Sequence, residues 1–182
     1  MSDFIMLKNV RVSFPHLFSR PYVNGEEGKC GATLMLEPKE NSEAIQLIQE
    51  QIDELVNAKF KGRSVASDRL CLRAGEDKGR SEYQGYLVLS ANSKGRPLVI
   101  SNDGRTLITS QEDCPIYAGC YVNAKIRLWS QNKHYGKRIN AELIALQFAK
   151  HGEPLDGAYV SVEEAMAGFG DITQESEDLL AA

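Results

Sequence analysis

The sequence predicts a mainly β fold with one long helix. Several short segments alternate apolar and polar residues, which is the pattern of a half-buried strand. Only residues 42–60 repeat apolar residues at three- and four-residue spacing over the length of a helix. The composition, 42% hydrophobic and 25% charged over 182 residues, is ordinary for a single soluble globular domain.

The first predicted strand covers residues 4–14, and its alternation shifts midway. Two apolar positions in its first half share the phase of Val10 and Val12, but Ile5 and Leu7 between and beside them are apolar too. The strand is therefore either buried on both faces at its start or interrupted by a bulge. Phe14 shares the phase of Val12 and is expected in the core, and Pro15 is expected to end the strand.

A second strand over residues 29–36 precedes the helix over 42–60, which Gly62 is expected to end. Residues 63–80 then turn polar, with five basic residues against three acids. We expect a long mobile loop here, because a loop of this length in a compact domain is more often functional than idle. Its basic residues are Arg63, Arg69, Arg73, Lys78 and Arg80.

The remaining segments predict further strands and a short helix. Asn102-Asp-Gly104 is a strong hairpin signal, and a capping box begins at Ser161 with Gly168 past its end. The predicted elements are strands over residues 83–92, 98–101, 106–108, 121–131 and 139–148 and a helix over 161–166.

The two faces of the predicted strand over residues 121–131 differ in chemistry. One face is apolar, and the other interleaves Lys125 and Arg127 with Tyr121 and Trp129. Cations attract phosphates while flat rings offer bases a stacking surface, so this face suits a single-stranded nucleic-acid groove. Outward Tyr and Trp are also common at subunit interfaces, so a protein-interaction module that forms a homodimer stays open as the alternative.

Neighbouring turns extend this basic and aromatic surface. The hairpin after residue 131 is richer in cations and rings than a hairpin tip needs, and the turn after residue 92 carries two more cations. The candidate nucleic-acid contacts beyond the strand itself are Lys133, His134, Tyr135, Lys137, Arg138, Tyr86, Lys94 and Arg96.

The charge is divided unevenly along the chain. The net charge of −4 combines a body of residues 1–150 at +4 with a last segment of 32 residues at −8 that has no Lys or Arg. A basic body with an acidic end suits a charge-regulated nucleic-acid binder, and acidic ends also serve as solubilising tails. We expect one domain over residues 1–170 and a disordered tail over 171–182, whose acids are Asp171, Glu175, Glu177 and Asp178.

The sequence gives little support for a membrane protein, an exported protein, a metalloprotein or an enzyme. No run of about 18 apolar residues or signal segment indicates membrane insertion or export. The four cysteines form no Cys-x-x-Cys pair and are expected to be reduced and mostly buried, so we expect no metal and no cofactor. No catalytic motif is found, and we expect no enzyme, because acids such as Asp103, Glu112 and Asp113 are more often solvated than arranged as a nuclease site.

Several segments together resemble the single-stranded DNA-binding proteins of tailed bacteriophages, in particular a family long catalogued as a conserved domain of unknown function. The similar segments span nearly the whole chain, and each alone is weakly specific. They are Lys-Asn-Val-Arg-Val-Ser-Phe-Pro-His-Leu-Phe (8–18), Tyr-Gln-Gly-Tyr (83–86), Arg-Pro-Leu-Val (96–99) and Tyr-Ala-Gly-Cys-Tyr-Val-Asn-Ala (117–124), followed by Gly136 and the acidic end.

The resemblance implies an OB-like five-stranded β-barrel with one helix and extra loops. It also implies binding of single strands without sequence preference in the host cytoplasm, and a tail that other replication proteins recognise. A standard OB barrel has its helix between the third and fourth strands, whereas this sequence shows two strands before residue 41. Either the first strand bends into two, or the barrel carries additional elements. The tail ends in Leu-Leu-Ala-Ala and lacks the terminal aromatic residue of some such tails.

Overall fold

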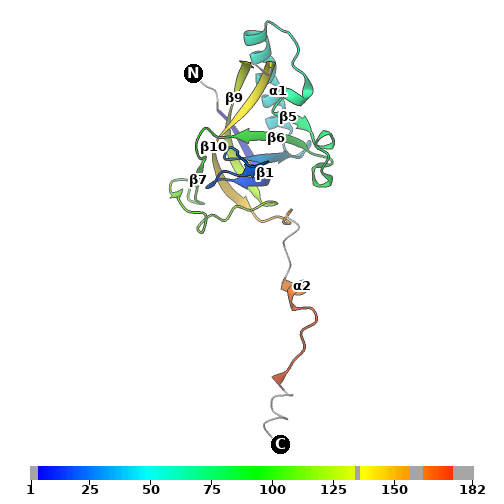
Figure 1. Ribbon diagram of the computed structural model, residues 1–182, viewed down its shortest axis with the longest axis vertical. Helices are drawn as coiled ribbons and strands as arrows, with labels where there is room; N and C mark the ends of the chain where they lie inside the picture. The colour runs from blue at the N-terminus through cyan, green and yellow to red at the C-terminus, as the bar shows by residue number, and fades with distance from the viewer. Residues whose placement is uncertain (1–3, 134–135, 156–161, 174–182) are drawn as a thin grey trace, which may run out of the picture.

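Five strands close into a β-barrel, with one long helix beside it (Figure 1). The computed structural model describes residues 4–133, 136–155 and 162–173. In chain order, the first barrel strand pairs with the second, the second with the third, the third with the fifth, the fifth with the fourth and the fourth with the first. The barrel strands are β1 (Phe4–His16), β4 (Gly31–Leu36), β6 (Leu87–Asn92), β9 (Tyr121–Lys133) and β10 (Gly136–Lys150).

This pairing order is that of an OB barrel, so the predicted fold class is confirmed. The helix α1 (Ser42–Phe60) follows β4 and therefore lies between the second and third barrel strands. Because β1 stays a single strand, the second of the two sequence-based alternatives holds, and the barrel carries additional elements. These are the strands β2 (Tyr22–Val23), β3 (Glu26–Glu27), β5 (Leu72–Ala74), β7 (Leu98–Ile100) and β8 (Leu107–Ile108), the 3₁₀ turns η1 (Ser67–Arg69), η2 (Gly75–Lys78) and η3 (Ser81–Tyr83), and the short helix α2 (Val162–Met166).

A bulge in the first half of β1 explains its shifted alternation. The pairing with β9 slips between Leu7 and Val10, and Asn9 between them has a left-handed backbone with φ of 53°. Phe4 and Met6 are about half exposed, at 50% and 49%. The strand is therefore not buried on both faces, and the extra residue at the bulge moves the core positions from odd to even numbers.

The second half of β1 departs from the sequence-based expectation. The strand runs through Pro15 to His16, so the prediction that Pro15 ends it is wrong. Phe14 is 42% exposed, whereas Ser13 is buried at 2%, so the expected core position of Phe14 is also wrong. The reason is local: Phe14 has a left-handed backbone with φ of 50°, and the pairing with β4 slips between Ser13 and His16.

The segment from residue 63 to 86 is more ordered than predicted. Instead of a mobile loop over residues 63–80, the chain forms the 3₁₀ turns η1 and η2 and the strand β5, which pairs with β6, and η3 follows directly. The strand predicted to start at Tyr83 begins at Leu87. Tyr83 instead packs with Met35 and Val88 on the outside of the barrel. The η2–η3 segment thus covers part of the outer surface of β4 and β6.

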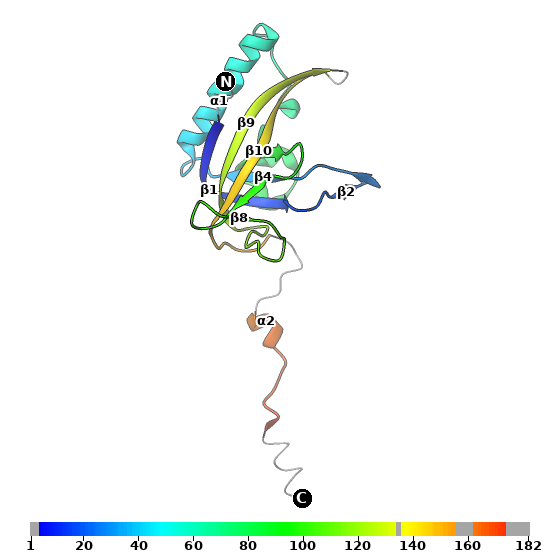
Figure 2. The same ribbon diagram turned by 90° about the vertical axis from the view of Figure 1, so that its left-hand side faces the viewer.

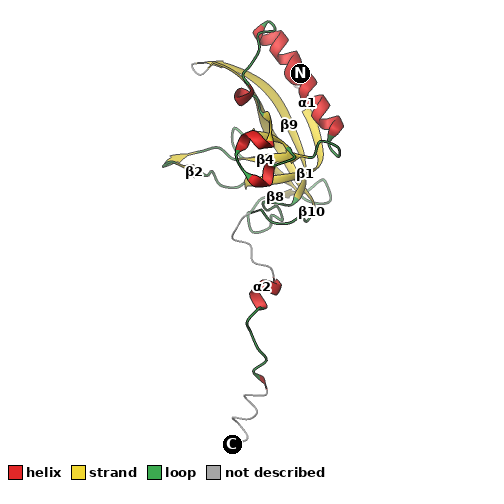
Figure 3. Ribbon diagram, turned by 90° about the vertical axis from the view of Figure 1, so that its right-hand side faces the viewer, coloured by secondary structure: helices red, strands yellow, loops and turns green. Residues whose placement is uncertain are grey.

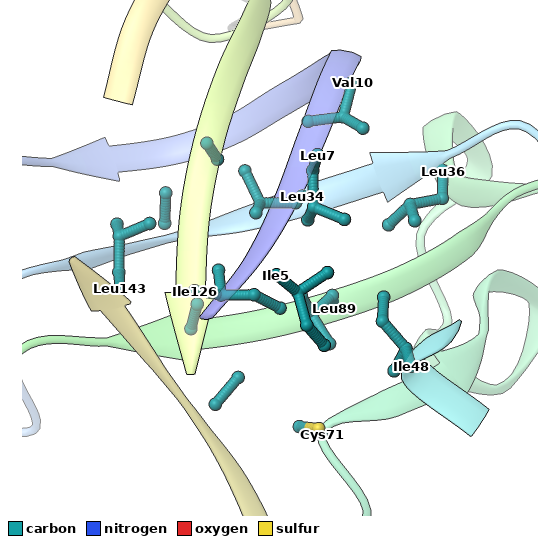
Figure 4. Close-up of a cluster of buried hydrophobic side chains, with 14 of the residues drawn as sticks. Ile5, Leu7, Val10, Leu34, Leu36, Ile48, Cys71, Leu89, Ile126 and Leu143 are labelled. Carbon is teal, nitrogen blue, oxygen red and sulfur yellow. The ribbon is translucent and has the colours of Figure 1, made fainter. Parts of the chain in front are cut away.

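The main core fills the inside of the barrel and the space under α1. Figure 4 shows Ile5, Leu34, Leu89 and Ile126 of the barrel strands pointing toward one another, with Ile48 of α1 beside them. All five side chains are completely buried. The apolar stripe of α1 therefore contributes to the same core as the strands.

The four cysteines are free thiols, as the sequence predicted. Cys30, Cys71 and Cys120 are buried and Cys114 is half-buried. Burial raises the pKa of the Cys71 thiol to about 12, so this thiol is protonated at neutral pH and unreactive. No helix among the described residues is long and apolar enough to cross a membrane.

Two neighbouring residues of α1 test how the helix packs. Ile48 is fully buried and Leu47 is 42% exposed. Replacing Ile48 by Ala should lower the free energy of unfolding by about 2–5 kcal/mol, because it leaves a cavity under the helix. Leu47→Ala is the matched control and should change the free energy of unfolding by about 0.5 kcal/mol or less. Urea denaturation followed by circular dichroism measures both, and equal losses would contradict this orientation of α1.

Candidate nucleic-acid interface

An open cleft of about 550 Å³ lies on the outside of the barrel. Its base is formed by outward side chains of three strands, including Ser90 and Asn92 of β6, Trp129 of β9 and Asn140 of β10. The parallel pairing of β6 with β10 brings these strands together, since Ala141 lies opposite Ala91. β9 and β10 form a long curved hairpin along the barrel (Figure 2). We call this hollow the basic cleft.

The walls of the basic cleft carry six cationic side chains and two acidic ones, Asp68 and Glu142. An excess of one sign of charge in a concave surface concentrates the field and attracts ligands of the opposite sign. The chemistry therefore favours a polyanion. The six cations are Lys29, Arg69, Arg73, Lys78, Lys94 and Arg138.

Backbone pairing of the segment after α1 positions two of these cations. Leu70 forms a β-bridge with Ile139 of β10, which places Arg69 beside Gly136 at the start of that strand. In β5, Arg73 lies opposite Val88 of β6. The segment predicted as a loop thus forms a wall of the basic cleft.

Lys78 is crowded against another cation. Its Nζ lies 3.4 Å from the hydroxyl oxygen of Ser90, at the base of the cleft. Burial lowers the pKa of Lys78, and the positive charge of Arg73 lowers it further. Both effects disfavour the charged form, and a bound anion would reverse the second. This corner of the cleft is therefore suited to a phosphate.

Trp129 stands in the cleft within a cross-strand group of polar side chains. It lies opposite Asn140, and Gln131 lies opposite Arg138, in the antiparallel pairing of β9 and β10. The amide of Asn140 donates a hydrogen bond of 3.0 Å to the side-chain oxygen of Gln131. Trp129 is 40% exposed. Its ring can accept a base while the two amides and Arg138 face the same ligand.

The other two cations of the β9 face lie outside the cleft lining. Arg127 donates from Nε to the carboxylate of Glu142 at 3.0 Å, and a second nitrogen of its guanidinium binds the same oxygen. The Phe4 ring of β1 lies 5.6 Å from the Arg127 guanidinium and 5.4 Å from Nζ of Lys125. The sequence placed these cations correctly on the outward face, but in the pairing of β9 with β1 they lie opposite Phe4 and Met6 and so beside β1.

Tyr121 and Tyr86 lie together at a second, smaller hollow. Both line it with Lys8, Glu37 and Lys150, and none of these residues lines the basic cleft. Nζ of Lys150 lies 4.7 Å from the centre of the Tyr121 ring. Both tyrosines are half-buried. The structure therefore separates these two rings from Trp129.

The turn candidates are distributed between the cleft and other contacts. Lys94 and Arg138 line the basic cleft. Arg96 lies over the ring of Phe18 at 5.2 Å. Lys137 donates to the backbone oxygen of Ser64 at 3.1 Å, which directs it toward the segment after α1. Three further candidates remain: Lys133, which is exposed near the end of β9, and His134 and Tyr135, which lie outside the described residues.

Of the four acids of the predicted tail, one lies within the described residues. Asp171 is exposed and accepts a hydrogen bond of 2.9 Å from the backbone N–H of Thr173. Hydrogen bonds from Thr173 lower the pKa of the Asp171 carboxyl. Glu175, Glu177 and Asp178 lie outside the described residues. The division of the chain at residue 170 stays a prediction.

Lys29, Arg69, Arg73 and Lys78 are absent from the sequence-based site. The basic composition of residues 63–80 was a usable signal for the last three, but it did not show that this segment pairs with β6 and β10. Lys29, the first residue of the predicted second strand, offered no comparable signal. In the part of the chain that the structure describes, no group of three or more His, Cys, Asp or Glu side chains could hold a metal ion.

Comparison with known families identifies the relatives of this fold. The model of the family described as "Enterobacter phage Enc34, ssDNA-binding protein" matches residues 4–180. The chain belongs to this family. The resemblance found in the sequence is thereby confirmed, and the match covers both the barrel and the acidic end.

Individual relatives agree with the family match. A protein of Acyrthosiphon pisum secondary endosymbiont phage 1, named "Putative protein p50", is 35% identical over 98% of this chain and 99% of its own length. The single-stranded DNA-binding protein of bacteriophage Enc34, solved in complex with ssDNA, is 34% identical with a TM-score of 0.75, over 84% of this chain and 89% of that one. The single-stranded DNA-binding protein gp2.5 of bacteriophage T7 shares the fold. It is 10% identical with a TM-score of 0.57, over 94% of this chain and 97% of that one.

The position of Trp129 leads to a direct test. Replacing Trp129 by Ala should weaken binding of oligo-dT by about 1–3 kcal/mol, because a stacked base loses its platform. The protein should remain folded, since the ring is 40% exposed. Fluorescence anisotropy of labelled oligo-dT measures the affinity.

Tyr121→Ala is the matched comparison for this test, because Tyr121 lies on the same strand but outside the basic cleft. If the affinity of Tyr121→Ala for oligo-dT changes little, base stacking takes place only in the cleft. Equal losses in the two variants would instead favour binding along the whole outward face of β9. Unchanged affinity in a folded Trp129→Ala protein would remove this ring from the site.

Proposed function

We propose that the protein binds single-stranded DNA in the basic cleft without strong sequence preference. The observation that carries this proposal is the convergence of six cations and Trp129 in one open cleft. The membership of the family and the DNA complex of the Enc34 relative support it. Cationic grooves with aromatic platforms are the usual solution for single strands, because every base has a flat face to stack.

Different side chains of the cleft bind the phosphates and the bases of the DNA strand. Arg73 and Lys78 bind phosphate on one wall, and Arg138 does so on the other. A base stacks on Trp129. The neighbouring amides of Asn140 and Gln131 can each donate or accept hydrogen bonds to a base edge. Because an amide adapts to different edges, this arrangement tolerates different bases.

A duplex fits this site less well than a single strand. Its bases are stacked on one another, so their faces are withheld from Trp129. Only its phosphates remain for the cations of the cleft. Single strands should therefore bind more tightly than duplex DNA at equal salt.

In the phage, this binding would protect single strands and support DNA replication and recombination in the host cytoplasm. The protein acts as a binding protein and not as an enzyme in this proposal. The acidic tail would regulate binding and recruit replication or recombination proteins. A body at +4 joined to an end at −8 supports the regulatory part, because a tethered polyanion competes at high effective concentration.

Salt dependence is the central experiment. The logarithm of the affinity for oligo-dT should fall with the logarithm of salt concentration with a slope of about −0.7 for each phosphate neutralised, and hence about −2 to −4 for a few contacts. Arg73→Ala should weaken binding and make this slope less steep by about 0.7. Isothermal titration over a salt series, with oligo-dT and a duplex of equal length, measures both effects.

Lys39→Ala is the charge-matched control for Arg73→Ala. Lys39 follows the end of β4 that is distant from Lys29 and does not line the basic cleft. It should leave both affinity and slope unchanged. A flat salt response of the unaltered protein would contradict the proposed function, and assembly lost on mutation of Trp129 would favour the homodimer alternative.

Deletion of residues 171–182 tests the tail. It removes Asp171, Glu175, Glu177 and Asp178 and should tighten binding, most visibly at low salt, where screening is weakest. Duplex binding should gain most, because the weaker ligand suffers more from an internal competitor. A full-length variant with these four acids changed to Asn or Gln separates charge from length. Equal affinities of the full-length and truncated proteins at low salt would leave the tail as a solubilising end.

A further inference from the structure

Phe14 has an unusual combination of backbone and side-chain environment. Its ring is 42% exposed, and its backbone is left-handed with φ of 50°. This conformation is unfavourable for a non-glycine residue, and exposing a large apolar ring adds to the cost. Such strained residues concentrate at sites that hold ligands. The exposed ring of Phe14 is therefore a candidate for contact with a ligand.

The surroundings of Phe14 fix the ring in place. The guanidinium of Arg80 lies 4.5 Å from the ring centre. Arg80 is oriented in turn by Glu82, which accepts a hydrogen bond of 2.7 Å from its Nε. In the next residue of this turn, the hydroxyl of Tyr83 donates to the hydroxyl of Ser13 at 3.0 Å. The turn η3 is thereby tied to β1 immediately before Phe14.

The backbone beside Phe14 lies two strands away from the base of the basic cleft. Ser13 of β1 is paired with Thr33 of β4, and Thr33 is paired with Ser90 of β6. Two strand spacings, about 10 Å, therefore separate the backbone beside Phe14 from Ser90 in the cleft. The η2–η3 segment, which carries Lys78 into the cleft and Arg80 onto Phe14, spans this interval over β4 (Figure 3).

We propose that Phe14 and Arg80 form a second base-stacking subsite, which holds a nucleobase of the DNA strand where it leaves the basic cleft past Lys78. This inference rests on the proposed function and extends its site onto the second half of β1. The ring of Phe14 offers a stacking face, and Arg80, which Glu82 holds on that ring through Nε, can donate from its other guanidinium nitrogens to the adjoining phosphate. The left-handed backbone turns the ring outward, where it can contact a bound DNA strand.

A purely structural role makes different predictions. If Arg80 and Phe14 only cover the barrel, loss of the ring should lower stability and affect oligonucleotides of every length equally. If the ring holds a base beyond the cleft, only oligonucleotides long enough to reach it should respond. Phe14→Gly should also keep the protein folded, because glycine adopts a positive φ without strain.

The experiment compares oligo-dT of about 4 and about 16 nucleotides, which bracket the site sizes of OB folds. Trp129 is the only tryptophan of the chain, so its quenching reports occupancy of the basic cleft in every Phe14 variant. Phe14→Gly and Phe14→Leu should bind the long oligonucleotide about 5- to 100-fold more weakly and the short one as the unaltered protein does. Phe14→Tyr should keep the affinity for both, and Trp129→Ala, followed by anisotropy, should weaken both.

The outcomes distinguish this inference from the proposed function. If the unaltered protein binds both lengths and Phe14→Leu binds the long one equally well, the second subsite is overturned while the cleft stands. If the Phe14 variants bind the short and the long oligonucleotide equally more weakly, the ring stabilises the fold and the second subsite is likewise overturned. If the unaltered protein binds neither oligonucleotide, the proposed function fails and the subsite with it.

Discussion

Closure of the barrel through β1 is the constraint on which the rest of the structure depends. This strand pairs with β9 through Phe4–Arg11 and with β4 through Arg11–His16, so it must bend between two neighbours. The bulge at Asn9 supplies the bend and shifts the core positions by one residue. Once the barrel is closed, each strand has one inner and one outer face. The polar faces of β6, β9 and β10 then meet on the outside, where the basic cleft lies.

The parts of the fold that depend on local periodicity could be predicted from the sequence. The alternation in residues 121–131 gave the inner and outer faces of β9 correctly, including the outward Trp129, because a strand's period of two is fixed by backbone geometry. The spacing in α1 gave its bounds and its buried stripe for the same reason. The family resemblance added the barrel, which no single segment of this sequence specifies.

Features that depend on pairing between distant segments could not be predicted in this way. Arg69, Arg73 and Lys78 reach the basic cleft only because Leu70 bridges β10 and β5 pairs with β6. The sequence showed their charge but not these partners. The prediction for Phe14 is wrong for a different reason. Phe14 does share the phase of Val12 in the sequence, but its left-handed backbone and the register slip beside it turn its side chain to the opposite face of the strand. A pattern of period two has no means of reporting such a residue.

The cations on the outer surface differ in what surrounds them, and this difference explains why charge along the chain does not locate the site. Arg127 binds the carboxylate of Glu142 across the hairpin, so much of its charge is neutralised within the protein. Lys78 is instead held partly buried near Arg73, and both conditions lower its pKa. Two like charges kept together in a concave surface are destabilised until an anion binds between them. A phosphate at this corner of the basic cleft would therefore relieve the repulsion between two cations, whereas one at Arg127 would compete with Glu142, although the sequence favoured Arg127 over Lys78 as a contact.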